Sequence, residues 1–251
     1  MTTGFLHPGA MGASMAAACA GECLWVGEGR SAATRQRAVA AGMIDVGSIE
    51  ALVARADVIV SVCPPGEALT VADRVAAAGF DGVYVDANAV SPGTARAVGS
   101  RFGRFVDGGV IGAPVREGGS TRLYLSGAAA PTVADLWRET ALEVVVIDGD
   151  VGAASAVKAC YAAWTKGTAA FLLAIRALAR AEDVEDALLG EWSRSQPDLV
   201  KRSELAASGN ASKAWRFVGE MHENADAFAA RDLPDGFLRA AAQVYERMAP
   251  L

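Results

Sequence analysis

The chain has few of the residues from which metal centres and disulfide frameworks are built. Its 251 residues include two histidines and four cysteines, and their spacing matches no zinc-ligand pattern. Disulfide frameworks are typical of small secreted domains, and this chain is much longer than those. We therefore expect no metal site, and we expect reduced, mostly buried thiols at Cys19, Cys23, Cys63 and Cys160.

Long uncharged apolar runs are also missing. No window of about 18 apolar residues lacks a charge, so the sequence predicts no transmembrane helix. The first residues lack the basic stretch that opens a signal peptide. The net charge of −6 disfavours nucleic acid and anionic membranes as partners, because both repel a negative protein. Together these absences favour a cytoplasmic protein that acts on a small molecule.

The most informative motif is at the N-terminus. A short apolar strand runs into a turn and then into an alanine-rich helix, and the turn reads His7-Pro8-Gly9-Ala10-Met11-Gly12. This is the layout of a dinucleotide-binding βα unit, although His7 stands where the G-x-G-x-x-G pattern has its first glycine. The alternative is an ordinary buried strand and turn. We predict that His7, Pro8, Gly9, Met11 and Gly12 bind a dinucleotide.

The residues after the second expected strand indicate which dinucleotide binds. This strand, Cys23–Gly27, is followed by Glu28-Gly29-Arg30-Ser31 and then by Thr34-Arg35. An acidic residue at the strand tip holds the ribose of NAD, whereas arginine accommodates the 2′-phosphate of NADP. We expect Arg30, Ser31 and Arg35 to bind that phosphate, which makes NADP(H) the cofactor. The alternative is a solvated helix start in which Ser31 is only the N-cap.

The pattern of expected elements changes near residue 150. Before it, strand and helix signals alternate, which predicts a mainly parallel sheet with helices on both faces. After it, strand signals vanish and amphipathic helices take over. The sequence therefore predicts an α/β fold: a Rossmann-type doubly wound domain over 1–150, followed by an all-α domain over 151–251 that holds substrate and dimerises.

The expected elements can be placed by residue number. Beyond the two strands above, we expect strands at 57–62, 82–86, 104–110, 122–126 and 144–147. We expect helices at 48–55, 67–78, 91–101, 152–180, 184–194, 212–231 and 235–248, with a break at Gly209-Asn210. Ligands of such sheets bind at the carboxyl ends of the strands, so Cys63 and Pro64 in the turn after Val62 are expected to cover the adenine or ribose.

One polar strip lies on the first helix of the second half. Helical spacing puts Lys158, Tyr161 and Thr165 on one face of an otherwise apolar helix. A partly desolvated lysine can act as an acid or a base, because burial disfavours its charged form. The alternative is a lysine near a helix start that reaches into water. On an α-helical wheel Lys166 lies about 80° away from Lys158, which favours a structural or interface role.

Several motifs resemble those of the β-hydroxyacid dehydrogenase superfamily, which includes 3-hydroxyisobutyrate and 6-phosphogluconate dehydrogenases. The family opens with G-F-[IL]-G-x-G-x-M-G, and residues Gly4–Gly12 read G-F-L-H-P-G-A-M-G. The variant L-H-P-G-x-M-G resembles a bacterial branch with a short helical C-terminal domain. The family's N-R-T, D-x-S-T-x-x-P, D-A-P-V-S-G-G and G-x₅-K-x-x-N-N segments match, in order, residues 29–31, 86–92, 107–113 and 152–162.

The resemblance implies roles for further residues. The positions at which this sequence departs from the family lie in the substrate-binding segments. It implies that Lys158 is catalytic, that Asn88 lies near the nicotinamide ribose, and that the chain forms a homodimer. Asn88-Ala89 stand where the family has Ser-Thr, and Ile111 replaces the serine of the carboxylate-binding turn. Tyr161-Ala162 replace the paired asparagines. The cofactor half is therefore kept and the substrate half is rebuilt.

These observations predict an NADP(H)-dependent oxidoreductase. We expect hydride transfer between the nicotinamide and a hydroxy-acid-like carbonyl or alcohol substrate, with Lys158, Asn88 and Tyr161 as the catalytic residues. Imine reduction is one alternative, because imine reductases related to this family also abandon the hydroxy-acid contacts. A non-catalytic NADP-binding protein is the other.

Overall fold

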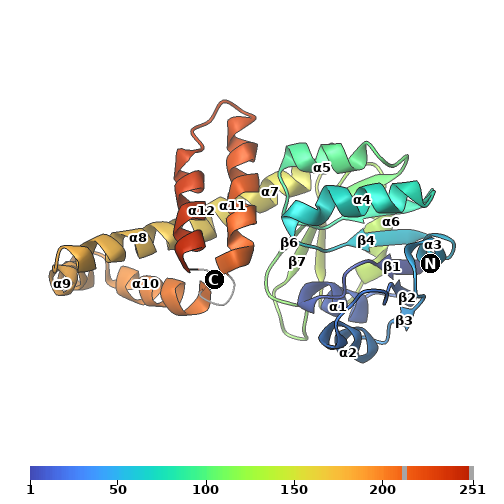
Figure 1. Cartoon of the computed structure of the whole chain (residues 1–251), viewed down its shortest axis with the longest axis horizontal. Coiled ribbons are helices and arrows are strands. Elements are labelled where there is room, and N and C mark those ends of the chain that lie inside the picture. Colours follow the sequence, from blue (N-terminus) through green and yellow to red (C-terminus); the bar gives the residue numbers. More distant parts are fainter. Residues whose placement is uncertain (211–213, 249–251) are drawn as a thin grey trace. The chain divides into compact units, whose positions relative to one another are not determined.

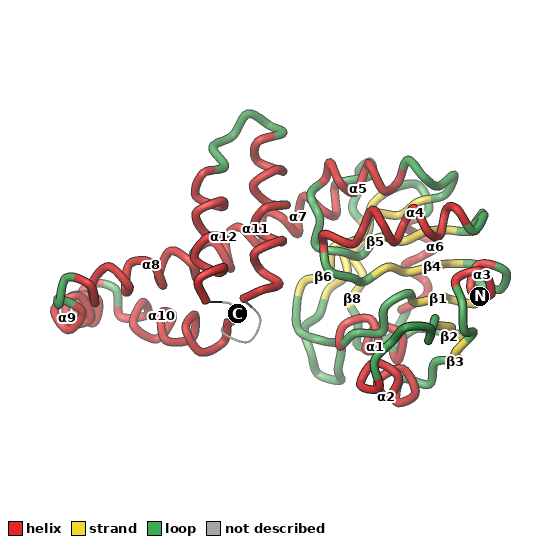
Figure 2. The backbone as a smooth tube through the Cα atoms, in the orientation of Figure 1, coloured by secondary structure: helices red, strands yellow, loops and turns green. Residues whose placement is uncertain are grey.

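The computed structural model describes residues 1–210 and 214–248 and forms two compact units. The first unit, Met1–Lys158, is an α/β domain, and the described residues of the second, Ala159–Leu251, are helical (Figure 1). The division lies within a helix, slightly beyond the domain boundary that the sequence suggested. The order of the layers in the first unit, with strands between helices, is visible in Figure 2.

The first unit is built on one eight-stranded sheet with the order β3-β2-β1-β4-β5-β6-β7-β8. β7 is antiparallel to β6, and the other neighbouring strands are parallel. The strands are β1 (Thr2–Phe5), β2 (Glu22–Trp25), β3 (Ile44–Asp45), β4 (Val58–Ser61), β5 (Val83–Asp86), β6 (Phe105–Ile111), β7 (Arg122–Ser126) and β8 (Glu143–Val146). Because the chain builds outward from β1 in both directions, the strand order reverses between β1 and β4. Ligands of doubly wound sheets bind at such a point.

Helices cover both faces of the sheet because successive strand residues point to opposite sides. Phe5 packs into the core under α1, α2 and α6, and the next residue, Leu6, packs into the core under α3, α4 and α5. Six helices lie wholly within this unit and α7 begins in it: α1 (Ala10–Ala17), α2 (Ala32–Ala40), α3 (Ile49–Val53), α4 (Ala68–Ala77), α5 (Pro92–Gly99), α6 (Ala130–Ala134) and α7 (Ala153–Ala162). The doubly wound fold expected from the sequence is confirmed.

The second unit packs its helices around small apolar residues. Its helices are α8 (Thr168–Ala181), α9 (Glu185–Ser195), α10 (Pro197–Asn210), α11 (Ala214–Ala229) and α12 (Gly236–Met248). Met221, Leu238 and Tyr245 form the centre of the core between α11 and α12. Arg176 on α8 bonds Glu185 at 2.7 Å and Ser203 at 3.2 Å, which joins α8, α9 and α10.

The helix expected over 152–180 is interrupted. Between α7 and α8 the chain forms a π-helical segment, Ala163–Gly167. The carbonyl oxygen of Lys166 in this segment accepts a hydrogen bond of 2.8 Å from the hydroxyl of buried Tyr245. A π turn closes on the fifth residue, so it rotates less per residue than an α turn. The wheel that separated Lys166 from the face of Lys158 is therefore wrong beyond Ala162.

Most expected elements are present close to their expected positions. The sequence did not predict β3, α6 or α10, and it offered α2 only as the alternative helix start at Ser31. β3 has two residues, too few to carry an alternating pattern. α10 begins at Pro197 with Asp198 in its first turn, which are the start signals of a helix. Asn210, expected in a break, is the last residue of α10. Ser212, where the next helix was expected to begin, lies outside the described residues.

Candidate functional site

Two turns meet at the point where the strand order reverses. The turn after β1 holds His7, Pro8 and Gly9, and the turn after β4 holds Cys63 and Pro64. The strands pair in parallel with Phe5 opposite Val60, so both turns leave the sheet at the same edge. The fold thus places together two segments that the sequence predicted separately.

The two glycines of the first turn have different surroundings. Gly9 is the N-cap of α1, and a Cβ added there would meet nothing within 4 Å. At Gly12, an added Cβ would lie 2.4 Å from the carbonyl oxygen of His7. Gly12 therefore lets α1 pack against the turn, and Gly9 leaves open space before the first N–H groups of the helix. Those groups and the helix dipole attract anions.

Positive charge gathers beside this opening. His7 Nδ1 and Arg30 Nε are buried and have no hydrogen-bond partner among the described residues. Burial, together with the smaller effect of the charges of Arg30 and Arg74, lowers the pKa of His7 to about 4. The pKa of Arg30 is lowered by its own burial and then by the charge of Arg74. An anion at this edge would meet unsatisfied nitrogen atoms in a positive field.

The residues predicted to bind phosphate do not all point to this turn. Ser31 caps α2, where its hydroxyl accepts a 3.3 Å hydrogen bond from the backbone nitrogen of Thr34. Arg35 forms a 3.2 Å ion pair with Asp45 and also donates a hydrogen bond to the backbone carbonyl oxygen of Gly27, in the turn after β2. Arg30 is directed the other way, and one of its terminal nitrogens bonds the carbonyl oxygen of Leu6 at 3.4 Å.

Sequence reasoning missed two arginines near the turn. Arg37 on α2 donates a 3.3 Å hydrogen bond to the carbonyl oxygen of Pro8. Its spacing of three residues from Thr34 was a usable signal, since the two side chains also bond at 3.0 Å. Arg74 on α4 acts on His7 and Arg30 through its charge. It had no local signal, because only packing of α4 on the sheet brings it there.

Asn88 organises the neighbouring turn. Its side-chain nitrogen donates to Ser61 Oγ at 3.2 Å and to Asp86 Oδ2 at 3.0 Å, and its side-chain oxygen accepts from the backbone nitrogen of Cys63. Asn88 is 2 % exposed. Burial raises the pKa of the Cys63 thiol to about 12, so this thiol is neutral at physiological pH. Asn88 therefore ties the ends of β4 and β5 together.

Asp107 anchors the helix that carries Lys158. The Asp107 carboxylate in β6 is fully buried and accepts hydrogen bonds from the backbone nitrogens of Gly152 and Ser155, at 2.9 and 3.0 Å. The hydroxyls of Ser155 and Ser126 also donate to it. A carboxylate at a helix N-terminus satisfies free N–H groups and complements the helix dipole.

The same strand also contacts the helix beside Lys158. A Cβ added at Gly109 in β6 would lie 3.0 Å from the Cβ of Lys158 and 2.7 Å from the carbonyl oxygen of Ala154. Glycine at this position thus permits α7 to approach β6 closely. Lys158 is partly exposed, and its backbone is fixed by Asp107 at the start of the helix and by Gly109 alongside it.

Within the second unit, a lysine and a carboxylate lie close together. Lys166 forms an ion pair with Glu220, with side-chain exposures of 19 % and 9 %. The Lys166 ammonium also lies 4.8 Å from the ring centre of Phe217. Tyr161, by contrast, is 45 % exposed at the end of α7. Lys166 is therefore part of the packing of α11, as the sequence favoured.

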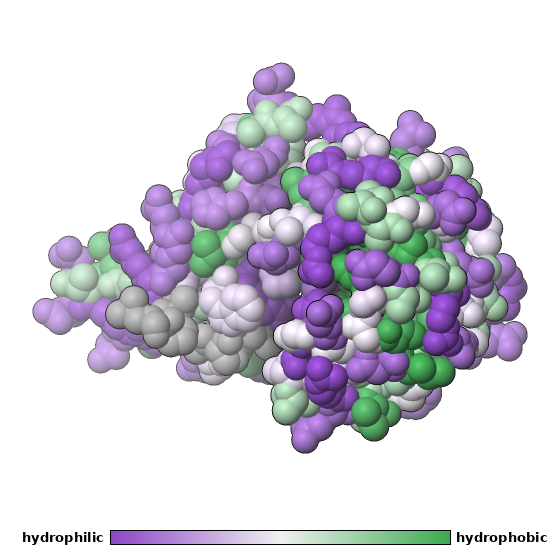
Figure 3. Space-filling view, turned by 45° about the vertical axis from the view of Figure 1, so that its right-hand side comes forward, coloured by the Kyte–Doolittle hydropathy of each residue, from purple (hydrophilic) through white to green (hydrophobic). Residues whose placement is uncertain are grey.

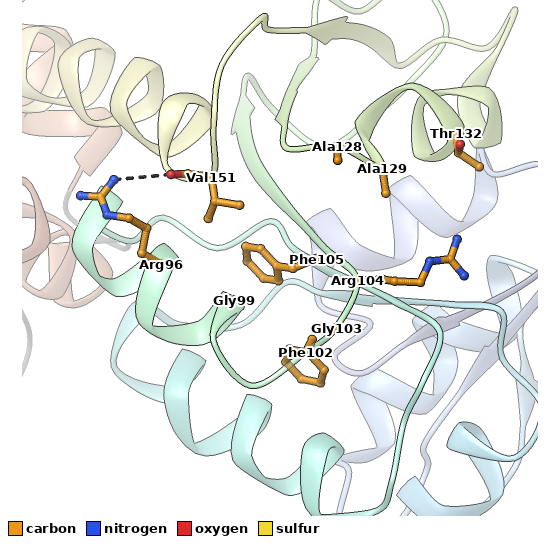
Figure 4. Close-up of a pocket in the computed structure, with 10 residues that line it drawn as sticks. All are labelled: Arg96, Gly99, Phe102, Gly103, Arg104, Phe105, Ala128, Ala129, Thr132 and Val151. Atoms are coloured by element: carbon orange, nitrogen blue, oxygen red, sulfur yellow. Dashed lines mark hydrogen bonds between the residues drawn. The ribbon is translucent and has the colours of Figure 1, made fainter.

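A cavity of about 610 Å³ lies away from the two turns (Figure 4). Its lining includes Arg104 at the start of β6 and Val151 after β8, which belong to the opposite edge of the sheet. Arg96 in its wall donates to the carbonyl oxygen of Val151 at 3.4 Å, and Phe102 stacks on buried Tyr84 at 4.1 Å. These side chains hold the domain together, and none belongs to the candidate site.

No described helix is long and apolar enough to span a membrane. No group of three or more histidine, cysteine or acidic side chains in the part of the chain that the structure describes could hold a metal ion.

Comparisons with known sequences identify two partial similarities. Residues 179–248 match a family described as a domain of unknown function, DUF1932. An uncharacterised 28.5 kDa protein of Methanothermus fervidus, from the 5′ region of 7S RNA, is 31 % identical over 164 residues. That match covers 64 % of this chain and 63 % of the relative, so the chain spans somewhat less than two thirds of it.

Comparisons with solved structures cover nearly the whole chain. A conserved protein of unknown function, MTH1747, described as structurally similar to 3-hydroxyacid dehydrogenases, is 26 % identical with a TM-score of 0.73 over 99 % of this chain and 96 % of its own. A 3-hydroxyisobutyrate dehydrogenase of Mycobacterium tuberculosis, solved with L-serine, is 20 % identical with a TM-score of 0.68, covering 98 % and 92 %.

A third solved structure extends the fold to a different chemistry. A reductive aminase of Aspergillus terreus, solved with NADPH4, cyclohexanone and allyl amine, is 17 % identical with a TM-score of 0.61, covering 98 % and 92 %. The chain thus shares the fold of 3-hydroxyacid dehydrogenases.

Substitutions at the two glycines should separate packing from open space. Gly12→Ala should lower the free energy of unfolding by about 1–3 kcal/mol, because its Cβ would collide with the His7 carbonyl. Gly9→Ala should cost less than about 1 kcal/mol, because its Cβ meets open space. Urea denaturation of both variants measures this, and equal losses would contradict the two assignments.

Acid should destabilise the protein through His7. Its folded pKa of about 4 lies below the unfolded value of 6.5. Between these values the unfolded chain binds a proton that the folded chain does not. The free energy of unfolding should therefore fall by up to about 1.4 kcal/mol per pH unit as the pH drops from 6.5 to 4.

His7→Gln should remove this part of the pH dependence in urea titrations across that range. His222→Gln on α11 is the control, because its side chain is 47 % exposed. A His7→Gln profile that still parallels the wild type would refute the assignment.

Proposed function

We propose that this protein is an NADP(H)-dependent oxidoreductase whose first unit binds the dinucleotide across the turns after β1 and β4. The observation that carries the proposal is the positive, unsatisfied opening in front of α1. Gly9 leaves space before the helix N-terminus, and the unpartnered nitrogens of His7 and Arg30 border it. A pyrophosphate supplies the negative charge and the acceptor oxygens that these groups lack.

The preference for NADP(H) rests on the residues after β2. Gly29 occupies the position where an acidic residue would bind the ribose of NAD, and its φ of +68° disfavours a side chain there. Arg30 follows with a free buried Nε. The reductive aminase of similar fold was solved with NADPH4, which supports the same cofactor here. We assign Ser31 to capping α2 and propose Arg37 and Arg74 as further contributors to the positive field.

Lys158 is the proposed acid–base residue. Bound NADPH supplies hydride to a carbonyl or related group, which then needs a proton or a positive neighbour. Lys158 can fill that role because Asp107 and Gly109 fix the backbone that carries it. Asn88 acts as a positioning residue, since its amide already bonds Ser61, Asp86 and Cys63. Tyr161, three residues after Lys158, is the alternative proton donor.

The proposed substrate is a hydroxy-acid-like carbonyl or alcohol that is bulkier or less anionic than a small hydroxy acid. Ile111, the last residue of β6, is 3 % exposed and stands where the resembled family has the serine that binds the substrate carboxylate. An apolar side chain cannot make that contact. Residues Leu6–Gly12, which read L-H-P-G-A-M-G, support our assignment of the chain to the bacterial branch that carries this variant. Imine reduction is a second candidate, favoured by exposed Tyr161 and by the reductive aminase fold.

We also propose a homodimer formed through the helical unit. Trp164, Phe171 and Leu178 recur at intervals of seven residues and are 62 %, 68 % and 64 % exposed. Side chains of this size are usually covered in a stable assembly. Light scattering tests this, and a monomer at working concentrations would contradict it.

On the face that Figure 3 shows, hydrophilic and hydrophobic side chains are interspersed.

Three variants test the cofactor assignment by isothermal titration calorimetry with NADPH and NADH. Arg30→Ala should weaken NADPH about 10–100-fold and NADH by less, because it removes a charge-assisted contact to the 2′-phosphate, which NADH lacks, and also one nitrogen beside the pyrophosphate that both share. Gly9→Ala should weaken both dinucleotides, because its Cβ enters the space proposed for the pyrophosphate they share.

Arg104→Ala, at the opposite edge of the sheet, should change neither affinity and is the matched control. Equal wild-type affinity for NADPH and NADH would refute the preference. No binding of either would refute the proposed function itself.

Turnover of an aldehyde, keto-acid and cyclic-imine panel tests the reaction. Lys158→Met should lower the single-turnover rate by roughly 10²–10⁴, the usual contribution of a positioned acid or base, with NADPH affinity nearly unchanged. Lys201→Met on α10 is a better control than Lys166→Met, because removing Lys166 would leave Glu220 without its ion-pair partner.

Tyr161→Phe distinguishes the two candidate donors. Near-wild-type hydride transfer in Lys158→Met together with its loss in Tyr161→Phe would assign the proton to Tyr161. Activity restricted to cyclic imines would replace the dehydrogenase proposal by imine reduction. Binding without turnover on any substrate would leave a dinucleotide-binding protein.

A further inference from the structure

Two cysteines converge where α1 ends and β2 begins. Cys19 follows the C-terminal end of α1, and Cys23 is the second residue of β2. The carbonyl oxygen of Ala16 contacts both residues: it accepts from the backbone nitrogen of Cys19 at 3.0 Å and lies 3.5 Å from the sulfur of Cys23. One acceptor thus brings the two cysteines together.

The neighbouring strand confirms that the two thiols share a side of the sheet. The sulfur of Cys19 lies 3.7 Å from the hydroxyl oxygen of Thr3 in β1. Thr3 is the direct register partner of Cys23, so these two residues sit on adjacent strands and point to one face. Both sulfurs border the core that covers this face.

The two thiols differ in exposure and in acidity. Cys19 is partly exposed and Cys23 is buried. A hydrogen bond from Cys23 lowers the pKa of Cys19, with a smaller contribution from the hydroxyl of Thr3. The same interaction, together with burial, raises the pKa of Cys23. Reactivity toward oxidants follows thiolate character and access, which selects Cys19 as the attacking group.

We propose that Cys19 and Cys23 form a reversible oxidation site for peroxides, with Cys19 as the reacting thiol and Cys23 as the resolving thiol. The Cys19 thiolate attacks a peroxide oxygen, so an S–O bond forms, the O–O bond breaks, and hydroxide or alkoxide leaves. Cys23 then attacks the sulfur of the resulting sulfenic acid. An S–S bond forms, the S–O bond breaks, and the departing hydroxide takes the Cys23 proton as water.

The electron balance closes within this pair and the peroxide. The two thiols lose two electrons and the peroxide gains two, so no further co-reactant is needed. The other cysteines lack this arrangement. Cys63 carries a neutral thiol whose pKa burial raises to about 12, and Cys160 lies in the second unit and is exposed. The site is independent of the proposed dehydrogenase activity, because it uses neither the dinucleotide turns nor Lys158.

Peptide mass spectrometry of the full-length protein tests the proposal. Reduced protein is treated with limiting hydrogen peroxide, unfolded in urea so that buried thiols become accessible, alkylated with iodoacetamide and digested with trypsin. Both cysteines fall in one tryptic peptide, residues 1–30, because Arg30 is the first lysine or arginine of the chain. We expect this peptide to lose both alkylation sites and two hydrogen atoms, and dithiothreitol to restore both sites.

Three serine variants separate the roles of the thiols. Cys23→Ser should stop at the sulfenic acid on Cys19, which dimedone traps. Cys19→Ser should leave Cys23 reduced and fully alkylated after unfolding, because the buried thiol of Cys23 is protected from peroxide in the folded protein. Cys160→Ser is the matched control and should form the disulfide at the wild-type rate.

Two results would overturn the proposal. The first is oxidation of Cys160 or Cys63 in wild-type protein while Cys19 and Cys23 both remain alkylatable. The second is over-oxidation of Cys19 to the sulfinic acid with Cys23 still alkylatable. Both are read from unmutated protein, so neither depends on how a variant folds.

Discussion

The hydrogen bonds of Asp107 are the interaction on which the proposed chemistry depends. A carboxylate buried in the middle of a sheet is costly unless its oxygens are satisfied. Here the backbone nitrogens of Gly152 and Ser155 and the hydroxyls of Ser126 and Ser155 satisfy them. The arrangement fixes the first turn of α7 on β6, and Gly109 in the same strand lets the helix approach at Lys158. A strand residue thereby determines where a helix residue stands.

A second constraint operates at the other proposed part of the site, where charge is concentrated without a counter-charge. Burial of His7, and then the charges of Arg30 and Arg74, lower the pKa of His7, and two buried nitrogens remain without partners among the described residues. Folding tolerates this because the rest of the turn is well made: Gly12 packs against the His7 carbonyl, and Arg37 bonds Pro8. Unsatisfied groups inside an otherwise complete turn are typical of a binding site.

In the helical unit, the constraint is the π-helical segment between α7 and α8. The wider turn at Ala163–Gly167 changes the direction of every later side chain, and the hydroxyl of Tyr245 stabilises it by bonding Lys166. Lys166 then reaches Glu220 and the ring of Phe217. Buried ion pairs add little net stability but favour one arrangement of side chains over others. The Lys166–Glu220 pair therefore helps to set the direction in which the side chains of α8 point.

The amino-acid sequence by itself determined the doubly wound fold, the helical second half and the turn before α1, because these depend on local periodicity and on glycine and proline positions. It also predicted Arg30 as a phosphate-binding residue, from its place after β2 between Gly29 and Ser31. Only the tertiary structure decided that Arg35 turns to Asp45, that Asn88 bonds Cys63, and that Arg74 acts on His7. It also revealed Asp107 as the anchor of α7 and the π turn that rotates Lys166. These outcomes join residues far apart in the chain or depend on how a distant side chain completes a turn. The local sequence pattern does not specify contacts between residues far apart in the chain, so these outcomes are decided by tertiary packing.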